Sequence, residues 1–304
     1  MAVDNVTKAI WQKLLGGVSS YPVAFGRVYY VDHFTGDNVN LGTDPALPFE
    51  TITYALTQCV AERNDYIFLL NVWANEPAFP VVIGLSRVHI IGIDLPTPWG
   101  WQTINGGGAN IFSLAAGYCE IAGISFTSLA ADAINVTAAG VYGWIHNCNF
   151  ASSSGLGLAN GIVAAGGGLA HGLIEDCEFS NAVGAPITVN GITGGLTNVT
   201  MRRNIFKACG GICINVNTNT EVGAIHDNYF LAPIADAEGV GWAITLGGPT
   251  AWEGGPIINN HAAQAGDGTG TNPYRDLSTG ALATMTHGWG MNYMGQAVIA
   301  PAFA

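Results

Sequence analysis

The sequence predicts an all-β fold, a right-handed parallel β-helix of about eight coils of about 27 residues with an N-terminal capping helix. Three observations predict it. Two sequence markers repeat with one period, the composition is rich in glycine and poor in charge, and a column of Asn and Cys residues recurs at one position of the repeat.

The first marker is a short apolar segment that ends in Phe. Its copies are Gly143–Phe150, Gly172–Phe179, Val199–Phe206 and Gly223–Phe230. Their final Phe residues are 29, 27 and 24 positions apart. A second marker, an apolar segment around an Ile, lies between these copies, and its Ile residues are 28, 25, 27 and 30 positions apart. The Ile residues of the second marker are Ile134, Ile162, Ile187, Ile214 and Ile244. Two interleaved markers with one period indicate a solenoid.

The composition fits coils of strand better than coils of helix. Hydrophobic residues make up 49% of the chain, which is enough for a continuous core, and charged residues only 10%, against roughly 25% in an average soluble protein. The chain has 42 glycines, and its segments are short and rich in Thr, Val and Ile, which favour strands. We therefore expect three short strands and three turns in each coil, with every strand parallel to its neighbours.

One polar column is expected inside the solenoid. Two positions before the aromatic residue, or before the residue that replaces it, the chain has Cys148, Cys177, Asn204, Asn228, Asn260 and Asn292. Asn tolerates the left-handed conformation of a tight turn, and stacked Asn amides bond one another along the axis. The sequence predicts an Asn ladder in which the two Cys residues fill the same position as apolar groups.

Residues 48–60 predict a helix that closes the N-terminal end. Ile52, Ala55, Leu56, Cys59 and Val60 fall on one helical face, after a Pro and an acidic residue that suit a helix start. The expected division of the chain is an N-terminal arm with a short helix at 1–27, an opening loop and capping helix at 28–65, the β-helix at 66–262, and a C-terminal loop, last coil and tail at 263–304.

The run GDNVNLGTDPALPFETITYAL, Gly36 to Leu56, resembles the start of proteins of the pectate-lyase-like right-handed parallel β-helix superfamily, of the phage decoration and tailspike kind. The resemblance covers roughly residues 28–295. It implies the fold, a capping helix and a first coil. It leaves function open, because the superfamily includes lyases, hydrolases, epimerases, tailspikes and capsid-bound proteins.

The candidate catalytic residues are Glu175, Asp176 and Lys207, in the most charged part of the repeat. A lyase of this superfamily would need several convergent carboxylates for Ca²⁺ and an Arg or Lys base. Glu175 and Asp176, however, fall at the same repeat positions as Arg202 and Arg203 of the next coil, which predicts an ion-pair ladder. We therefore expect no catalytic site, no metal and no cofactor, with Ca²⁺ only if the protein is an enzyme.

Other side chains with chemical potential favour structural roles. His146 and His226 share one repeat position, which places them in a column. Four Trp residues in loops are candidates for glycan contact, because aromatic faces stack on sugars, although loop Trp residues also close side pockets and interfaces. These are Trp99, Trp101, Trp242 and Trp252. The six cysteines form no CxxC pair and are expected to be reduced and buried.

The charge excludes some partners. The net charge of −12 repels nucleic acid and anionic membranes. No run reaches the roughly 18 apolar residues that a membrane-spanning helix needs, and Lys8, Gln12 and Lys13 interrupt any signal-peptide core near the N-terminus. We expect no nucleic acid, no membrane and no signal peptide.

The regular repeat, the charge-poor surface and the extra segments at both ends predict a non-enzymatic virion structural protein of a tailed phage. It would be a capsid decoration or cement protein, or a short spike subunit, on the virion exterior after assembly in the host cytoplasm. The expected partners are two further copies in a homotrimer, capsid or tail proteins through residues 1–27 and the C-terminal tail, and host glycans. The alternative is a carbohydrate-active enzyme of the polysaccharide lyase or hydrolase type, or a glycan-binding module.

Overall fold

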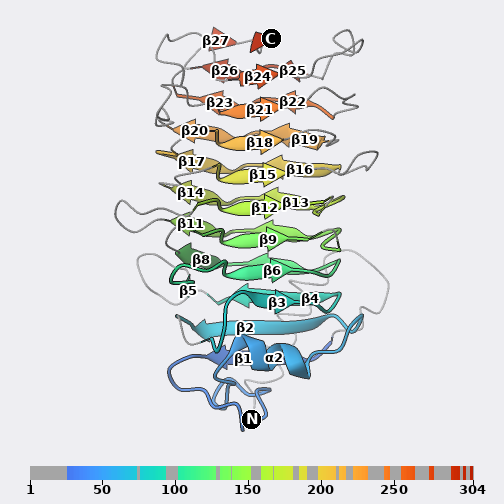
Figure 1. Ribbon diagram of the computed structural model, residues 1–304, viewed down its shortest axis with the longest axis vertical. Helices are drawn as coiled ribbons and strands as arrows, with labels where there is room; N and C mark the ends of the chain where they lie inside the picture. The colour runs from blue at the N-terminus through green and yellow to red at the C-terminus, as the bar shows by residue number, and fades with distance from the viewer. Residues whose placement is uncertain are drawn as a thin grey trace, which may run out of the picture.

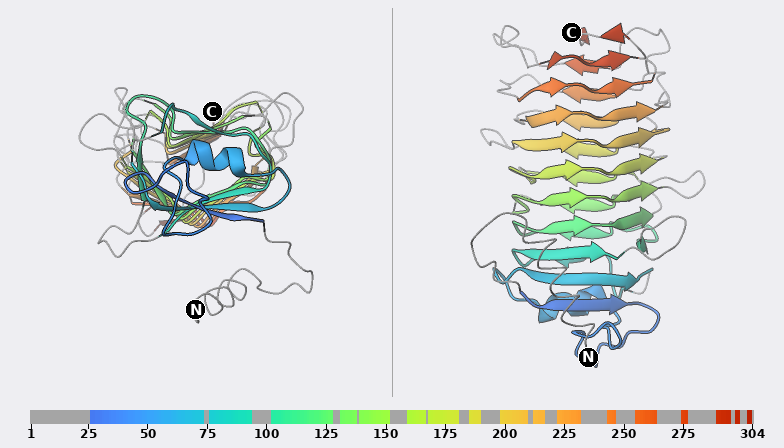
Figure 2. Two further views of the ribbon diagram at one scale, coloured as in Figure 1. Left: turned by 90° about the horizontal axis from the view of Figure 1, so that it is seen from below. Right: turned by 180° about the vertical axis from the view of Figure 1, so that it is seen from behind.

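Three parallel sheets run along a stack of coils and enclose one core (Figure 1; Figure 2). The computed structural model describes residues 26–73, 76–93, 102–127, 131–137, 139–151, 159–166, 168–180, 185–189, 198–209, 212–216, 222–231, 243–246, 255–263, 274–276, 289–294, 297–298 and 302–303. The predicted fold class is confirmed, and through the middle of the stack each coil adds one strand to each sheet.

Sheet 1 is the ten-stranded sheet. Its strands are β1 (Val28–Asp32), β2 (Asp65–Asn71), β4 (Val88–Gly92), β7 (Glu120–Ala122), β10 (Trp144–His146), β13 (Leu173–Glu175), β16 (Val199–Arg202), β19 (Val222–His226), β22 (Ile257–Ile258) and β25 (Trp289–Gly290). The predicted number of about eight coils was therefore too low. The difference arises at the N-terminal end, where β1 joins the stack ahead of the strand predicted to begin it.

Sheets 2 and 3 each have nine strands. Sheet 2 consists of β5 (Gln102–Asn105), β8 (Ile124–Thr127), β11 (Asn149–Ala151), β14 (Glu178–Ser180), β17 (Ile205–Lys207), β20 (Tyr229–Leu231), β23 (His261–Ala262), β26 (Tyr293–Met294) and β27 (Ala297–Val298). Sheet 3 consists of β3 (Val81–Ile83), β6 (Phe112–Leu114), β9 (Ile134–Val136), β12 (Ile162–Ala164), β15 (Ile187–Val189), β18 (Ile214–Val216), β21 (Ile244–Leu246), β24 (Tyr274–Asp276) and β28 (Ala302–Phe303). Only β27 pairs antiparallel among these strands.

The two sequence markers are the inward columns of two sheets. Phe150 pairs with Phe179 in sheet 2, and Ile162 pairs with Ile187 in sheet 3. The Phe rings stack face to face, with centroids 4.5 Å apart between Phe150 and Phe179 and 5.0 Å apart between Phe179 and Phe206. Because parallel strands pair in register, one inward residue type repeated in each coil forms a continuous buried stack.

The Asn column forms a hydrogen-bonded ladder at the turn between sheets 1 and 2. The Nδ2 of Asn204 donates to Oδ1 of Asn228 over 3.0 Å, Asn228 does the same to Asn260 over 3.0 Å, and Asn260 to Asn292 over 2.9 Å. The ladder Asn residues are fully buried or nearly so, as are Cys148 and Cys177 in the same column. All six cysteines are free and buried.

The left-handed residue of this turn is the one before the ladder residue, so the prediction that the ladder Asn adopts the left-handed conformation was wrong. Asn147, Asp176, Arg203, Asp227 and Asn259 have φ values between 51° and 58°. The ladder Asn is selected instead by its inward amide, which satisfies buried backbone groups.

The capping helix is α2 (Ile52–Gln58), which is shorter than predicted. It packs against β1, β2 and β3 and lies across the interior of the coils when the stack is viewed along its axis (Figure 2). Thr51 is the N-cap and accepts a hydrogen bond from the Tyr54 N–H. Val60, placed by the periodicity on the buried face, is outside the helix and 49% exposed.

The stack begins before this helix, because β1 pairs in parallel with β2. The residues 1–25 of the predicted arm lie outside the described residues. Within the described chain, no helix is long and apolar enough to cross a membrane.

Candidate functional site

The outer face of sheet 1 carries the most connected polar cluster that we find in the described chain. We call it the sheet 1 network. Its members come from β4, β7, β10, β13 and β16 and the turn that follows, and they are His89, Glu120, His146, Glu175, Arg202 and Arg203.

Glu120 lies between two imidazoles. Its Oε2 is 2.7 Å from Nδ1 of His89, and its Oε1 is 2.8 Å from Nε2 of His146. His89 is directly opposite Glu120 in the sheet, whereas His146 is two residues farther along the next strand, opposite Ala122. Burial raises the pKa of Glu120, but the hydrogen bonds from His146 and His89 outweigh it and lower this pKa to about 2.

His146 is placed to carry a proton on both nitrogens. Its Nε2 donates to Glu120, and its Nδ1 is 2.8 Å from the Oδ1 of Asn147, an atom that can only accept. Burial lowers the pKa of His146, but these two hydrogen bonds and the Glu120 charge outweigh it, so that its pKa is raised. The raised pKa of His146 and the lowered pKa of Glu120 both favour an imidazolium paired with a carboxylate.

Trp144 connects the two halves of the network. Its ring stacks on His146 with centroids 3.9 Å apart, and its Nε1 donates to Oε1 of Glu175 over 3.0 Å. The residue remains 40% exposed, so part of the indole faces solvent. Trp144 is thus a partly exposed aromatic side chain beside the charged groups of the network.

Glu175 ends the network in a set of ion pairs. Its Oε2 accepts from Nε of Arg202 over 2.7 Å and from Arg203, which also binds Asp176 at 2.8 Å. Burial raises the pKa of Glu175, but the bonds from Arg202 and Trp144 outweigh it and lower that pKa. The bond from Arg203 lowers the pKa of Asp176. Both carboxylates are held ionised.

Lys207, the third candidate catalytic residue, lies on β17 of sheet 2 and pairs with Oε2 of Glu178 at 2.7 Å. It therefore belongs to a separate pair on another sheet. The structure brings Glu175 and Asp176 together with Arg202 and Arg203, and places Lys207 in a neighbouring ladder.

Sequence reasoning did not single out His89, Glu120 or Trp144. Glu120 contacts His146 diagonally, so a comparison of equal repeat positions misses this pair, and His89 lies in a coil without either marker. A signal for Trp144 was present, because a large aromatic residue stands at an outward strand position of the repeat. The candidates Trp99, Trp101, Trp242 and Trp252 lie outside the described residues.

The network can hold charge but offers little for metal binding. Among the residues that the structure describes, no three His, Cys, Asp or Glu side chains are placed to hold a metal ion. Five carboxylates on or beside the outer faces of sheets 1 and 2 each have an Arg, Lys or His partner within 2.8 Å. They are Glu120, Glu175, Asp176, Glu178 and Asp227.

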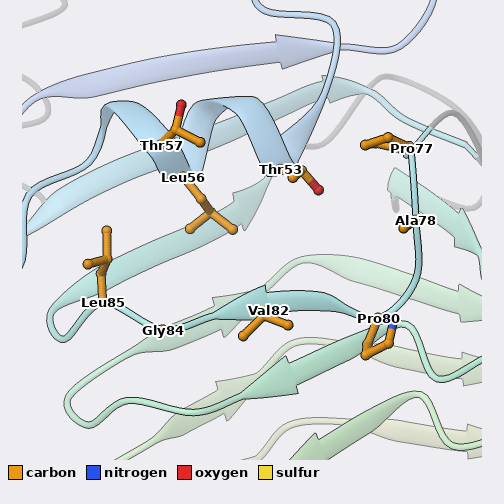
Figure 3. A pocket seen from close by; sticks show the side chains of 9 residues that line it. All are labelled: Thr53, Leu56, Thr57, Pro77, Ala78, Pro80, Val82, Gly84 and Leu85. Carbon is orange, nitrogen blue, oxygen red and sulfur yellow. The ribbon is translucent and has the colours of Figure 1, made fainter.

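A second feature is a groove of about 400 Å³ between α2 and β3 (Figure 3). No charged side chain is among the residues that line it. They are Thr53, Leu56, Thr57, Pro77, Ala78, Pro80, Val82, Gly84 and Leu85.

Comparison with known proteins supports the fold. The family model described as "Right handed beta helix region" matches residues 102–251. A solved structure named "Rhamnogalacturonan lyase" superposes with a TM-score of 0.51 at 13% identity, covering 83% of this chain and 70% of that chain. No curated protein sequence matches the chain. The predicted right-handed parallel β-helix is confirmed.

Proposed function

We propose that this right-handed parallel β-helix is a non-enzymatic structural protein, whose outer charges stabilise the stack instead of performing chemistry. The observation that carries the proposal is the pairing of Glu120, Glu175 and Asp176 with cations of neighbouring coils. A general acid needs a raised pKa to hold its proton near neutral pH, whereas the pKa values of these three carboxyls are lowered.

The assembly that we propose for it is a phage virion, with the chain as a capsid decoration or cement protein or a short spike subunit on the exterior. The support is compositional. Charged residues are only 10% of the chain, so that copies can pack side by side with few charges to desolvate. Residues 1–27 and the C-terminal tail are the segments that we propose for contact with capsid or tail proteins.

The test is a screen for depolymerisation of acidic polysaccharides, with and without Ca²⁺. The proposal expects no cleavage under either condition. The proposal would be overturned if the wild type cleaves a polysaccharide and Glu175→Gln or Lys207→Ala abolishes the cleavage. Circular dichroism must show that both variants are folded. Exposed Glu50→Gln is the matched control for a change of charge outside the network.

A second function, a carbohydrate-active enzyme of the lyase or hydrolase type or a glycan-binding module, is favoured by one specific observation. The half-exposed indole of Trp144 lies beside the Glu175 carboxylate, which joins a stacking face to polar groups. Binding of oligosaccharide by calorimetry, lost in Trp144→Ala but kept in Tyr229→Ala, would support glycan binding. Binding without cleavage would indicate a glycan-binding module, whereas binding with cleavage would indicate an enzyme.

A further inference from the structure

One column of side chains lines the corner where the strands of sheet 3 lead into those of sheet 1. We call it the corner column. The N–H of Tyr118 donates to the C=O of Val141, and the N–H of Tyr142 donates to the C=O of Ala170, in each case the residue before the next member. Each member therefore lies one coil beyond the last, about 4.8 Å away. All members have a φ between 46° and 63°, and they are Glu62, Arg87, Tyr118, Tyr142, His171 and Asn198.

The middle of the corner column is an exposed aromatic surface. Tyr118 and Tyr142 are 47% and 43% exposed, and their rings stack with centroids 4.6 Å apart. Trp144, which begins β10 two residues after Tyr142, is 40% exposed. Tyr, Trp and Arg are the residue types enriched in protein–protein interfaces. The composition of this corner is therefore that of a contact surface.

The geometry of the rings favours a protein partner over a sugar. A sugar stacks on the face of an aromatic ring, and in the column these faces are already covered. The guanidinium of Arg87 lies 5.2 Å from the centroid of the Tyr118 ring, on the side away from Tyr142. His171 covers the other face of Tyr142, with centroids 4.9 Å apart. The ring edges and hydroxyls of the two Tyr residues stay exposed, and these can pack and form hydrogen bonds in a protein interface.

Symmetry sets a condition on any face by which copies of this chain contact one another. A rotation axis parallel to the stack keeps every residue at its own height, so that each residue near the axis faces its own copy. Like charges that face each other are costly. Tyr118 and Tyr142 are uncharged and meet this condition. Arg87, at one end of the column, has its charge balanced by Glu62 at 2.7 Å.

Other faces of the described chain fit the condition less well. The corner between sheets 1 and 2 presents Asp176, Arg203 and Asp227 at successive positions, and each would face its own charge. The outer face of sheet 3 is uncharged at Ser113 and Thr188, but these side chains are small and offer little area to bury. The corner column combines exposed aromatic area with balanced charge.

We propose that the corner column, together with Trp144, is the face by which copies of this chain contact one another around a three-fold axis, with all stacks parallel. Tyr118 and Tyr142 of one copy then pack against the same residues of the other two. This inference rests on the side-by-side packing of copies proposed above and on the homotrimer expected from the sequence, and it adds the contact face and the orientation.

The first test is sedimentation equilibrium of the full chain, of Tyr142→Asp and of Tyr229→Asp. Tyr229 is the matched control, because it is 48% exposed on sheet 2 and also stacks on a neighbouring ring, that of His261. The wild type and the control should have three times the mass of the 31.6 kDa chain. Tyr142→Asp should have the mass of one chain, because it brings three carboxylates together at the axis. Asp tolerates the left-handed conformation of this position, and circular dichroism checks that the variants are folded.

The second test is cross-linking with a short bis-maleimide reagent, and it decides the matter if Tyr142→Asp does not fold. The six native cysteines are buried, so that an introduced thiol dominates the reaction. Tyr142→Cys chains should be joined to one another, because equal heights bring the new thiols together in a parallel arrangement. Tyr229→Cys chains should remain separate.

The possible failures are distinguishable. A trimer that Tyr142→Asp leaves intact, or Tyr142→Cys chains that are not joined, would overturn this contact face and leave the homotrimer standing. A wild type that is monomeric at all concentrations would overturn both. Oligosaccharide binding by such a monomer, lost in Tyr142→Asp, would assign the column to a glycan. Cleavage of a polysaccharide by a wild type that is trimeric through this face would support the face and overturn only the non-enzymatic function.

Discussion

At the scale of single residues, the outer face of sheet 1 depends on Glu120, which accepts hydrogen bonds from imidazoles of two neighbouring coils. The contact joins three strands that are far apart in the sequence, β4, β7 and β10. The strength of the contact between Glu120 and His146 depends on pH, because Glu120 must stay ionised and His146 must stay protonated.

The first prediction concerns this dependence. The pKa of Glu120 is lowered from 4.5 to about 2, so its contribution to stability is present above pH 4.5 and is lost as the pH falls toward 2. The pKa of His146 is raised from 6.5, so its contribution is present below pH 6.5 and is lost as the pH rises through the raised value. Glu120→Gln should lower the free energy of unfolding by about 2 kcal/mol, with the largest effect between pH 4.5 and 6.5.

Thermal unfolding of the wild type and Glu120→Gln across this pH range measures the difference. The control is Glu50→Gln on an exposed loop, which should change stability by less than about 0.5 kcal/mol at each pH. A difference between wild type and Glu120→Gln that stays constant from pH 3 to pH 9 would contradict the assignment of charge.

The second prediction concerns the Asn ladder. Asn228→Ala removes the acceptor of the Asn204 side chain and backbone N–H, and the donor to Met201. Buried groups left unpaired should destabilise the protein by about 3 kcal/mol, read from the denaturant midpoint at unchanged slope. Asn149→Ala, on the outer face of sheet 2, is the control. A midpoint shift no larger than that of the control would show that water replaces the ladder.

At the scale of elements, the cap is held by a side chain from outside its helix. Glu76 is buried, and it accepts hydrogen bonds from the N–H groups of Ile52 and Thr53 and contacts His33 at 3.0 Å. The acidic residue that the sequence analysis places at the helix start is Glu50, but it lies before the N-cap Thr51, and no acidic residue lies in the first turn of α2. The negative charge at this terminus comes from Glu76.

The third prediction follows from this arrangement. Glu76→Gln should loosen α2 and speed hydrogen exchange of the Ile52 and Thr53 amides by about tenfold or more, while amides of β15 keep their protection. Glu62→Gln, at an exposed turn, is the control. Uniform loss of protection through the whole stack would mean that the cap and the coils unfold as one unit.

The fourth prediction concerns the Phe stack of sheet 2. Phe179 is fully buried between Phe150 and Phe206. Phe179→Ala should cost about 3–5 kcal/mol through lost contacts and a cavity, seen by calorimetry as a lower melting temperature. Phe34→Ala, at a position 63% exposed, should leave the melting temperature nearly unchanged.

At the scale of the whole molecule, the described strands contact mainly the strands of neighbouring coils, as in other solenoids, so the flanks and ends of the stack are available to partners. The fifth prediction is the proposed homotrimer. Sedimentation equilibrium should give a mass three times that of the 31.6 kDa chain. A monomer at all concentrations would contradict the trimer, and with it the spike arrangement that we propose.

The sequence by itself determined the coil and the residues that point inward. Residues equivalent to Ile162 and Phe179 recur at nearly constant spacing, because in-register parallel strands place equivalent residues directly above one another. The inward-facing core positions can therefore be identified from the sequence alone. The stacking of Glu175 and Asp176 on Arg202 and Arg203 follows from the same spacing.

Tertiary structure alone decided the rest. The contact of Glu120 with His146 is diagonal, because His146 is opposite Ala122 and its side chain reaches back to Glu120, so a comparison of equal repeat positions does not reveal it. Glu76 reaches α2 from beyond the following strand, and β1 joins the stack ahead of the helix. The groove beside β3 depends on the widths of a helix and a strand at one end of the solenoid, which no local pattern in the sequence records.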